Sequence, residues 1–170
     1  MSNPRHEFVK GRIENGELVS QLAARVDAII NFAAESHVDR SITEPETFIK
    51  TNVTGTQVLL NAATQHKIKP FFQISTDEVY GTLGNEGMFT EETAYYPHSP
   101  YSASKAAAEE FCVAYENTYK MPIVVTHTMN VFGERQHPEK FIPMCIQRAR
   151  DGDKVYIHAN ADCTEAGTRM

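Results

Sequence analysis

Features that define secreted and membrane proteins are scarce or missing in this sequence. Its three cysteines, Cys112, Cys145 and Cys163, are scattered and odd in number, so they predict neither a disulfide framework nor a zinc site. No apolar run approaches the ~20 residues that span a bilayer, and the first residues contain no apolar signal-peptide core. We therefore expect a cytoplasmic protein without a membrane segment.

Excess positive charge is also missing. The chain has 16 lysines and arginines against 22 acidic residues, and no basic stripe indicates a nucleic-acid partner. Its histidines show no metal-ligand spacing, so we expect no metal site. The 170 residues, 41% of them apolar, are sufficient for one domain with a real core.

What the chain does contain is an alternation of short apolar segments and longer helical patterns. We expect strands at residues 6–9, 27–34, 70–74, 122–126 and 155–157. We expect helices at residues 16–25, 47–66, 100–119 and 141–150. This alternation predicts an α/β fold with a doubly wound parallel sheet. The apolar run 27–34 is typical of a strand that is buried on both faces.

The helix at 100–119 has a clear start signal. Ser99 is a suitable N-cap, and Pro100 takes the first helical position. The spacing of its apolar residues predicts that Ala107, Phe111 and Ala114 face the core.

A group of polar side chains follows the predicted strand 70–74. Thr76, Asp77 and Glu78 stand at its C-terminal end, which is where parallel sheets bind ligands. The threonine hydroxyl can hold a substrate hydroxyl. The two carboxyl groups fit the elimination of water, in which one removes a C–H proton and the other protonates the leaving hydroxyl. The alternative is a solvated acidic loop, which the flanking apolar residues disfavour.

Tyr101 and Lys105 are four residues apart, so on a helix they share one face. The ammonium group stabilises the phenolate and lowers a tyrosine pKa toward working pH. Such a tyrosine can accept a hydroxyl proton while hydride leaves the same carbon for a nicotinamide. The alternative is a chance pair on an exposed helix, and the polar strand end upstream favours the functional interpretation.

Two further stretches have both a functional and a structural interpretation. Gly81, Gly84 and Gly87 match the spacing of a glycine-rich dinucleotide motif, but no helix is expected directly after them, so we interpret 81–97 as a loop. The small residues at 33–34 either admit a flat cofactor or allow tight packing. His37 taken alone is more typical of a structural histidine.

Together these stretches resemble the extended short-chain dehydrogenase/reductase superfamily of NAD-dependent epimerases and dehydratases. Within it they are most similar to the nucleotide-sugar 4,6-dehydratases of the dTDP-glucose type. The similarity covers roughly residues 8–157 and rests on segments 32–42, 51–56, 75–81, 99–105 and 138–143. The adjacent Asp77 and Glu78 are the specific part, because sugar epimerases of the superfamily usually have small or neutral residues there.

The resemblance implies a role for each matching residue. The implied catalytic residues are Thr76, Asp77, Glu78, Tyr101 and Lys105. Among them Tyr101 is the redox base, Asp77 the acid at the sugar C6 hydroxyl and Glu78 the base at C5. The implied NAD-binding residues are Ala33, Ala34, Glu35, Ser36, Thr51, Asn52, Tyr101, Lys105 and Val131. The implied contacts to a nucleotide-sugar such as dTDP-glucose are His37, Thr76, Asn130, Lys140 and Phe141.

The resemblance also implies what is missing. Family members begin with a βαβ unit and a glycine-rich turn, whereas this sequence starts near their third strand. We therefore expect an incomplete, N- and C-terminally truncated Rossmann-like domain at 1–157 and the start of a sugar-nucleotide region at 158–170. Arg12 stands where the family usually has an aspartate that faces adenine, and Arg169 is a loose match to a pyrophosphate-binding arginine.

Two alternatives to a dehydratase stay open. One is an NAD-dependent nucleotide-sugar epimerase or decarboxylase that uses the same tyrosine and lysine. The other is a non-catalytic fragment that is unable to hold NAD. Since family members usually dimerise through two long helices of each subunit, the resemblance also implies a homodimer through helices 47–66 and 100–119.

Overall fold

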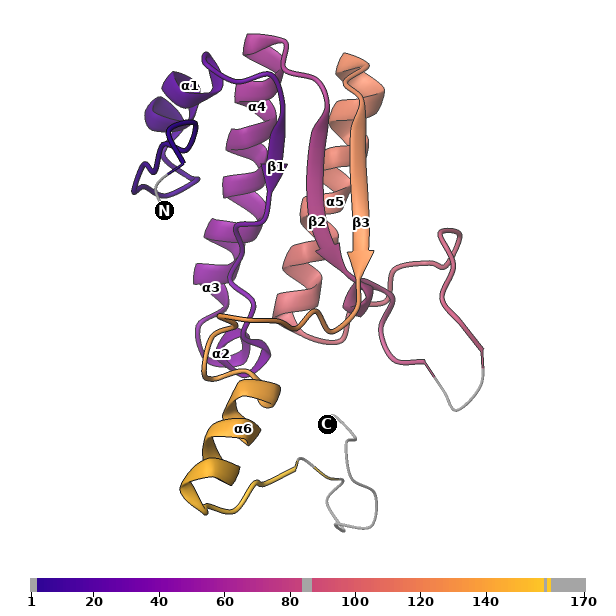
Figure 1. Cartoon of the computed structure of the whole chain (residues 1–170). Helices are drawn as coiled ribbons and strands as arrows, with labels where there is room; N and C mark the ends of the chain where they lie inside the picture. The colour runs from indigo at the N-terminus through magenta and orange to yellow at the C-terminus, as the bar shows by residue number, and fades with distance from the viewer. Residues whose placement is uncertain (1–2, 84–86, 158, 160–170) are drawn as a thin grey trace. The chain divides into compact units, whose positions relative to one another are not determined.

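The computed structural model describes residues 3–83, 87–157 and 159 (Figure 1). These residues form two compact units, Met1–Met129 and Asn130–Met170, which we describe separately. The expected sugar-nucleotide region at 158–170, including Arg169, lies outside the described residues except for Ala159.

In the described residues, the first unit is built on a parallel sheet of three strands. β1 (Ile29–Asn31), β2 (Phe71–Thr76) and β3 (Ile123–Thr128) lie in that order, and Phe71 pairs with Ile29 on one side and Ile123 on the other. Parallel neighbours need long crossover connections, and helices supply them here. The prediction of a parallel, Rossmann-like α/β sheet is confirmed.

The helices of this unit follow the sequence signals closely, with additions. Their bounds are α1 (Gly16–Ala23), α2 (Val38–Thr43), α3 (Pro45–Phe48), α4 (Thr56–His66) and α5 (Pro100–Tyr119). A π-helical segment, η1 (Ile49–Gly55), joins α3 to α4, so the expected helix 47–66 is one helical stretch with a wider turn inside it. The start of α5 is confirmed, because Ser99 and Ser102 form a reciprocal capping box with Pro100 in the first turn.

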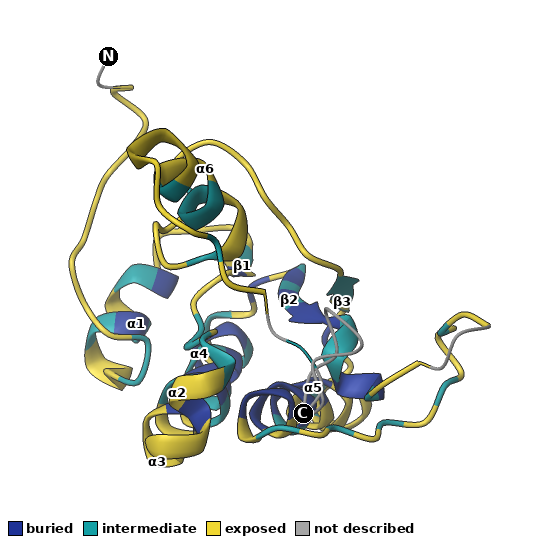
Figure 2. Ribbon diagram, turned by 90° about the horizontal axis from the view of Figure 1, so that it is seen from below, coloured by how far each residue is buried: buried dark blue, intermediate teal, exposed yellow. Residues whose placement is uncertain are grey.

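The core lies between the sheet and the helices. Figures 1 and 2 show α4 and α5 on one face of the sheet, and Figure 2 shows the buried residues gathered where they meet it. The buried cluster consists of Val19, Ala23, Leu60, Ala62, Ala63, Ile68, Phe71, Cys112 and Met121. Small residues on the helices allow this close packing.

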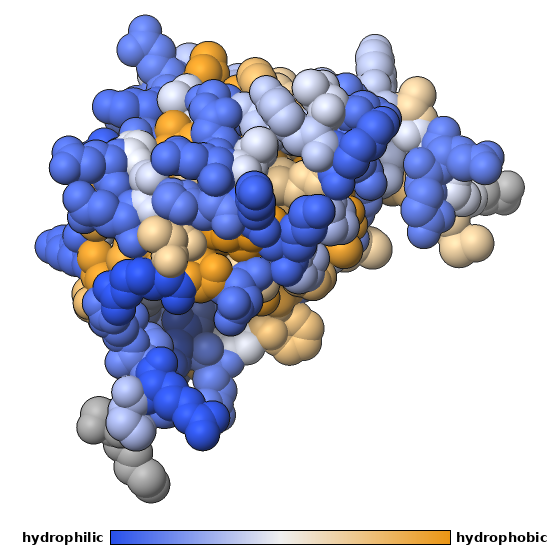
Figure 3. All heavy atoms as spheres, turned by 90° about the horizontal axis from the view of Figure 1, so that it is seen from above, coloured by the Kyte–Doolittle hydropathy of each residue, from blue (hydrophilic) through white to orange (hydrophobic). Residues whose placement is uncertain are grey.

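The opposite face of the sheet is apolar and open in the first unit. Ile30, Phe72 and Val124 stand in one row across the strands, and Ile30 is 56% and Val124 44% exposed. The expectation that 27–34 is a strand buried on both faces is therefore wrong. It is a strand only at 29–31, because β1 has one paired edge and one helix-covered face. Figure 3, a view from the N-terminal ends of β2 and β3, shows apolar side chains at the surface between polar regions.

Two other expected strands are also wrong. Residues 6–9 and 155–157 are irregular, and Phe8 is 79% exposed. A β-strand needs a neighbouring strand to satisfy its backbone groups. Within the described ranges, neither segment has such a neighbour.

The inward face of α5 also differs from the expectation. Phe111 and Ala114 are exposed and Ala107 is half-buried, whereas Lys105, Ala108, Glu109 and Cys112 are buried. Apolar spacing predicted the opposite face. Lys105 and Glu109 bind β2, and these polar contacts turn the helix so that its charged groups face the sheet.

The second unit contains α6 (Phe141–Asp151), where a helix was expected at 141–150. It ends at Gly152, which has a positive φ of 75° as is usual after a helix C-terminus. Across the described part of the chain, no helix combines the length and the apolar character that crossing a membrane requires.

Cys112 provides a test of this packing. Burial, with Glu109 adding and Lys105 opposing, raises the pKa of its thiol to about 12. Only about one molecule in 10,000 then carries the thiolate at pH 8. In a Cys145→Ser/Cys163→Ser variant we expect iodoacetamide to label Cys112 at pH 8 only after unfolding in urea. Labelling of the folded variant at the rate of a small-molecule thiol would contradict this packing.

Candidate active site at the C-terminal end of β2

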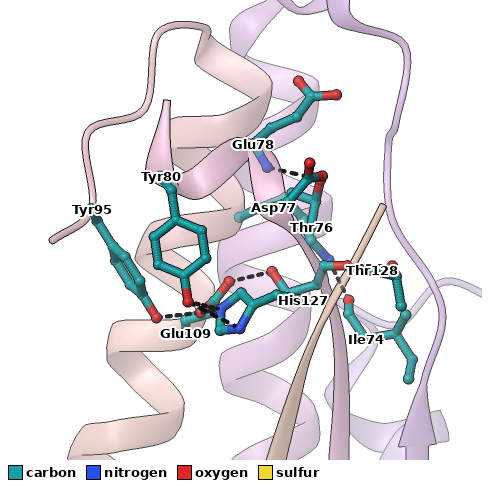
Figure 4. Close-up of polar contacts among 11 residues, drawn as sticks. Ile74, Thr76, Asp77, Glu78, Tyr80, Tyr95, Glu109, His127 and Thr128 are labelled. Atoms are coloured by element: carbon teal, nitrogen blue, oxygen red, sulfur yellow. Dashed lines mark hydrogen bonds and ion pairs between the residues drawn. The ribbon is translucent and has the colours of Figure 1, made fainter. Parts of the chain in front are cut away.

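The polar group after β2 forms a short turn. Thr76 is the last residue of the strand, and Asp77 and Glu78 begin a 3₁₀ turn, η2 (Asp77–Tyr80). The Thr76 hydroxyl oxygen accepts a hydrogen bond from the Glu78 amide at 3.2 Å and lies 3.3 Å from Asp77 Oδ1. Figure 4 shows the Glu78 side chain pointing away from the cluster of Tyr80, Glu109 and His127. The threonine thus caps the turn that presents both carboxyl groups.

Lys105 reaches the same strand end from α5. Its side chain is 4% exposed, and Nζ donates to the Ile74 carbonyl oxygen at 2.6 Å. Tyr101 lies one turn earlier on the helix, is buried, and its ring contacts Phe48 edge to face with centroids 6.3 Å apart. Because α5 packs against both β2 and η2, the predicted tyrosine–lysine pair and the predicted acidic turn belong to adjacent elements.

Burial lowers the pKa of Lys105 from its ordinary value, while the nearby Glu109 and Cys112 oppose that shift. Burying an ammonium group away from water costs free energy unless other groups bind or neutralise it. The Ile74 carbonyl and the negative Glu109 one turn away do so. The Lys105 ammonium group is therefore fixed beside the C-terminal end of β2.

The predicted cofactor loop at 33–36 is fixed by two buried amides. Asn31 Oδ1 accepts from the Ala33 amide at 3.1 Å. Asn52, which η1 presents, accepts from the Glu35 amide at 2.8 Å and donates to the Glu35 carbonyl at 3.0 Å. Its Nδ2 also donates to Ser104 Oγ at 2.8 Å, so one side chain joins the loop to α5. The Asn52 side chain thus determines the loop conformation by binding the loop backbone at Glu35.

Other predicted residues are placed around this loop. Ala33 and Ser36 are exposed, while Ala34 and Glu35 are partly exposed. Thr51 precedes Asn52 in η1 and is partly exposed. His37 caps the N-terminus of α2, where Nδ1 accepts from the Arg40 amide at 3.4 Å. This capping contact does not conflict with a ligand-binding role for the rest of the ring.

Four predicted residues belong to the second unit: Asn130, Val131, Lys140 and Phe141. Lys140 is the N-cap residue of α6 and Phe141 its first residue. Their roles at the site remain a prediction. Arg12, which stands at the expected adenine position, is exposed in the first unit and forms an ion pair of 3.7 Å with Glu14.

Sequence reasoning missed a buried polar cluster beneath this strand end. Glu109 on α5 accepts from the hydroxyls of Ser75 and Tyr95 and lies 2.7 Å from His127 Nε2, and Tyr80 Oη lies 3.2 Å from His127 Nδ1 (Figure 4). Two signals in the sequence could have indicated it. Glu109 is four residues after Lys105 in a run of alanines, and His127 interrupts an otherwise uncharged strand.

The described part of the loop after η2 does not form a phosphate cradle. Gly81 has a φ of 87°, and a Cβ there would lie 2.4 Å from the Tyr96 carbonyl oxygen. No helix follows at 87–97, so the described part of the loop lacks the helix N-terminus that a dinucleotide motif requires. Among the residues that the structure describes, no group of three or more histidine, cysteine, aspartate or glutamate side chains is arranged to hold a metal ion.

With this geometry in place, comparison with known proteins identifies the family. The profile of the family described as GDP-mannose 4,6 dehydratase matches residues 1–166. This chain belongs to that family. The resemblance to the epimerase/dehydratase superfamily is thereby confirmed.

Curated relatives within the family are close in sequence. The low-salt glycan biosynthesis protein Agl12 of Haloferax volcanii is 51% identical over 160 residues, which are 94% of this chain and 51% of Agl12. The dTDP-glucose 4,6-dehydratase of Xanthomonas campestris is 47% identical over 169 residues, covering 93% of this chain and 48% of the enzyme. The chain thus spans about half the length of the curated relatives it matches.

Solved structures agree with this assignment. DesIV, a dTDP-glucose 4,6-dehydratase from Streptomyces venezuelae crystallised with NAD, superposes with a TM-score of 0.90 at 40% identity, over 94% of this chain and 49% of DesIV. The UDP-glucose 4-epimerase of Thermotoga maritima superposes with a TM-score of 0.87 at 27% identity, over 94% of this chain and 53% of the epimerase. Dehydratase and epimerase therefore share this fold.

The buried lysine makes stability depend on pH in a defined direction. Its folded pKa lies below the ordinary 10.5, so between those values the unfolded chain binds more protons than the folded chain. Unfolding free energy contributed by this group therefore rises with pH in that window. We expect the wild type to gain stability relative to Lys105→Met as pH approaches 10.5, as measured by urea unfolding followed by circular dichroism.

The control for this titration is Lys50→Met, which removes an exposed lysine. Its stability difference from the wild type should stay flat over the same pH range. A Lys105→Met difference that is equally flat would show that burial of this ammonium does not influence folding.

Proposed function

We propose that this chain carries the catalytic part of a nucleotide-sugar 4,6-dehydratase that acts on dTDP-glucose or a similar nucleotide-sugar with NAD. The observation that carries the proposal is the pair of carboxyl groups on η2. Asp77 and Glu78 follow Thr76 at the end of β2, and the buried Lys105 binds the preceding Ile74. The similarity to dTDP-glucose 4,6-dehydratases at 40–47% identity supports it.

The residues present fit the nicotinamide end of NAD. The backbone of loop 33–36 is held by Asn31 and Asn52, and its alanine side chains leave room for a flat ring. Lys105 places a cation beside the same strand ends. The described residues contain no strand, glycine turn and helix in sequence that would cradle the pyrophosphate. NAD, when bound, supplies the acceptor and later the donor of a hydride.

In this proposal each side chain has one task. Tyr101, with Lys105 beside it, takes the proton of the sugar C4 hydroxyl as that carbon is oxidised, and Thr76 holds the same hydroxyl. The C4 ketone acidifies the neighbouring C5 hydrogen, which Glu78 removes. Asp77 protonates the C6 hydroxyl, which leaves as water. Reduction at C6 and return of the proton to C5 complete the reaction.

The competing function is epimerisation on the same scaffold, favoured by the fold shared with UDP-glucose 4-epimerase. An epimerase needs the tyrosine and the lysine but no base for C5 and no acid for C6. The acidic pair on η2 therefore favours the dehydratase. A cytoplasmic location, expected from the scattered cysteines, is part of the proposal.

The decisive experiment replaces Glu78. We expect the purified chain, supplied with NAD and dTDP-glucose, to release the 4-keto-6-deoxy sugar and to incorporate solvent deuterium at C5. Glu78→Gln should lower that turnover by about 10²–10⁴-fold, because it removes the base. Product and deuterium are measured together by NMR.

Glu91→Gln, which changes an exposed glutamate of the following loop, is the matched control and should keep wild-type turnover. Equal release of the 4-keto-6-deoxy sugar by Glu78→Gln and the wild type would show that Glu78 is not the C5 base. A wild type that inverts C4 without forming that sugar would be an epimerase. If the wild type binds no NAD in calorimetry, the non-catalytic alternative gains and the dehydratase assignment fails for this chain.

We also propose a homodimer through the two long helical stretches, 47–66 and 100–119. Support comes from the outer side of α5, where Ala103, Phe111 and Ala114 are exposed and Ala107 is half-buried in one stripe. Small residues around one aromatic ring suit close packing of a second helix. α4 packs beside α5 and extends the same layer.

Phe111→Glu tests the dimer. A charge placed in a helix–helix interface should weaken association by roughly tenfold or more, because it is desolvated without a partner. Light scattering over a concentration series measures the change. Met88→Glu, in the exposed loop, serves as control and should leave the mass unchanged. A wild type that stays monomeric at high concentration would disprove the dimer.

A further inference from the structure

Glu109 is the most deeply buried charged group of the first unit that the proposed reaction leaves unused. It is 1% exposed, and it binds three separate segments: Ser75 on β2, Tyr95 on the loop that returns to the sheet, and His127 on β3. A carboxylate that joins three segments constrains their relative positions.

The hydrogen bonds around Glu109 are mutually consistent. An ionised carboxylate only accepts, so Ser75, Tyr95 and His127 Nε2 all donate to it. His127 then carries its hydrogen on Nε2, which leaves Nδ1 to pair with the Tyr80 hydroxyl at 3.2 Å. Three donors offset the desolvation of the carboxylate, and the loss of its charge would weaken all three bonds together.

The hydrogen bonds of this cluster reach both ends of the acidic turn. Glu109 binds Ser75 before the turn, and His127 pairs with Tyr80 at its end. Ser75 directly precedes Thr76, and Tyr80 ends η2. The loop that carries Tyr95 is also joined to the turn directly. The Tyr96 amide donates a hydrogen bond of 2.9 Å to the Val79 carbonyl oxygen, one residue after the Tyr95 that Glu109 binds. The Tyr80 ring also packs against Phe89, Tyr95 and His127.

We propose that Glu109 is a positioning residue that holds η2, and with it Asp77 and Glu78, in a fixed orientation at the end of β2. It acts through Ser75, Tyr95 and His127 and is too deeply buried to touch a substrate. The effect of Glu109 on catalysis rests on the proposed dehydratase function. Its effect on the orientation of η2 does not depend on that function.

Hydrogen exchange measured residue by residue by NMR tests the hold. In Glu109→Gln we expect the amides of Gly81, bonded to Glu78, and of Tyr96, bonded to Val79, to exchange at least tenfold faster. Amides of α1 and α4 should change less than twofold. The matched control is Glu110→Gln, which changes the exposed neighbour on the same helix and should leave every amide at its wild-type rate.

A second variant tests the contact through Tyr95 alone. It also keeps the proposal testable if Glu109→Gln does not fold. Tyr95→Phe removes one donor and leaves the carboxylate in place. It should accelerate the exchange of the same two amides. Adding Glu109→Gln to Tyr95→Phe should accelerate them less than Glu109→Gln accelerates them in the wild type, because one of the three donors is already missing. Equal acceleration in α4, no acceleration at all, or independent effects in the double variant would overturn the proposal.

Activity separates this proposal from the dehydratase assignment. Where the wild type turns over, a misplaced Asp77–Glu78 turn predicts that Glu109→Gln lowers kcat at least tenfold with KM within twofold. A general loss of folded protein would leave kcat per folded molecule unchanged and would count against positioning. If the wild type is inactive but the exchange pattern is as expected, the dehydratase assignment fails while the hold on the turn stands.

Discussion

The arrangement of this protein depends on how the polar side of α5 meets the end of β2. Lys105 binds the Ile74 carbonyl, and one turn later Glu109 binds the adjacent Ser75. Two buried charges of opposite sign, each with a strand partner, tolerate little rotation of the helix, since any turn would leave one of them without its partner. This contact decides which side of α5 is core, where Tyr101 lies and why Phe111 faces outward.

A common device secures the irregular segments beyond the strand ends. Asn31 and Asn52 bind the backbone of loop 33–36, and Thr76 binds the Glu78 amide of the acidic turn. Segments past the end of a sheet lose their ladder hydrogen bonds, and buried side chains replace them here. The proposed site residues thus lie on backbone that accepts hydrogen bonds from side chains or donates hydrogen bonds to them.

Sequence patterns correctly predicted those features of the fold that depend on residues close together in the chain. The capped start of α5 follows from Ser99 and Pro100, and the parallel sheet follows from the alternation of strand and helix patterns. Patterns failed where the result depends on distant partners. An apolar run does not say whether helices cover both faces of β1. Apolar spacing in α5 could not outweigh contacts of Lys105 and Glu109 with a strand about 30 residues earlier, and for the same reason the Glu109 cluster stayed hidden.

The fold of this chain does not by itself distinguish a dehydratase from an epimerase. A dehydratase at 40% identity and an epimerase at 27% superpose on this chain almost equally well, so the sheet and its helices do not distinguish the two reactions. Within this chain, the proposed function assigns the difference to a few side chains at the strand ends. In the proposed reaction, the four-residue turn Asp77–Tyr80 supplies the acid and the base for water loss, and a turn this short has no stable geometry of its own. Its orientation therefore has to come from the buried groups around it.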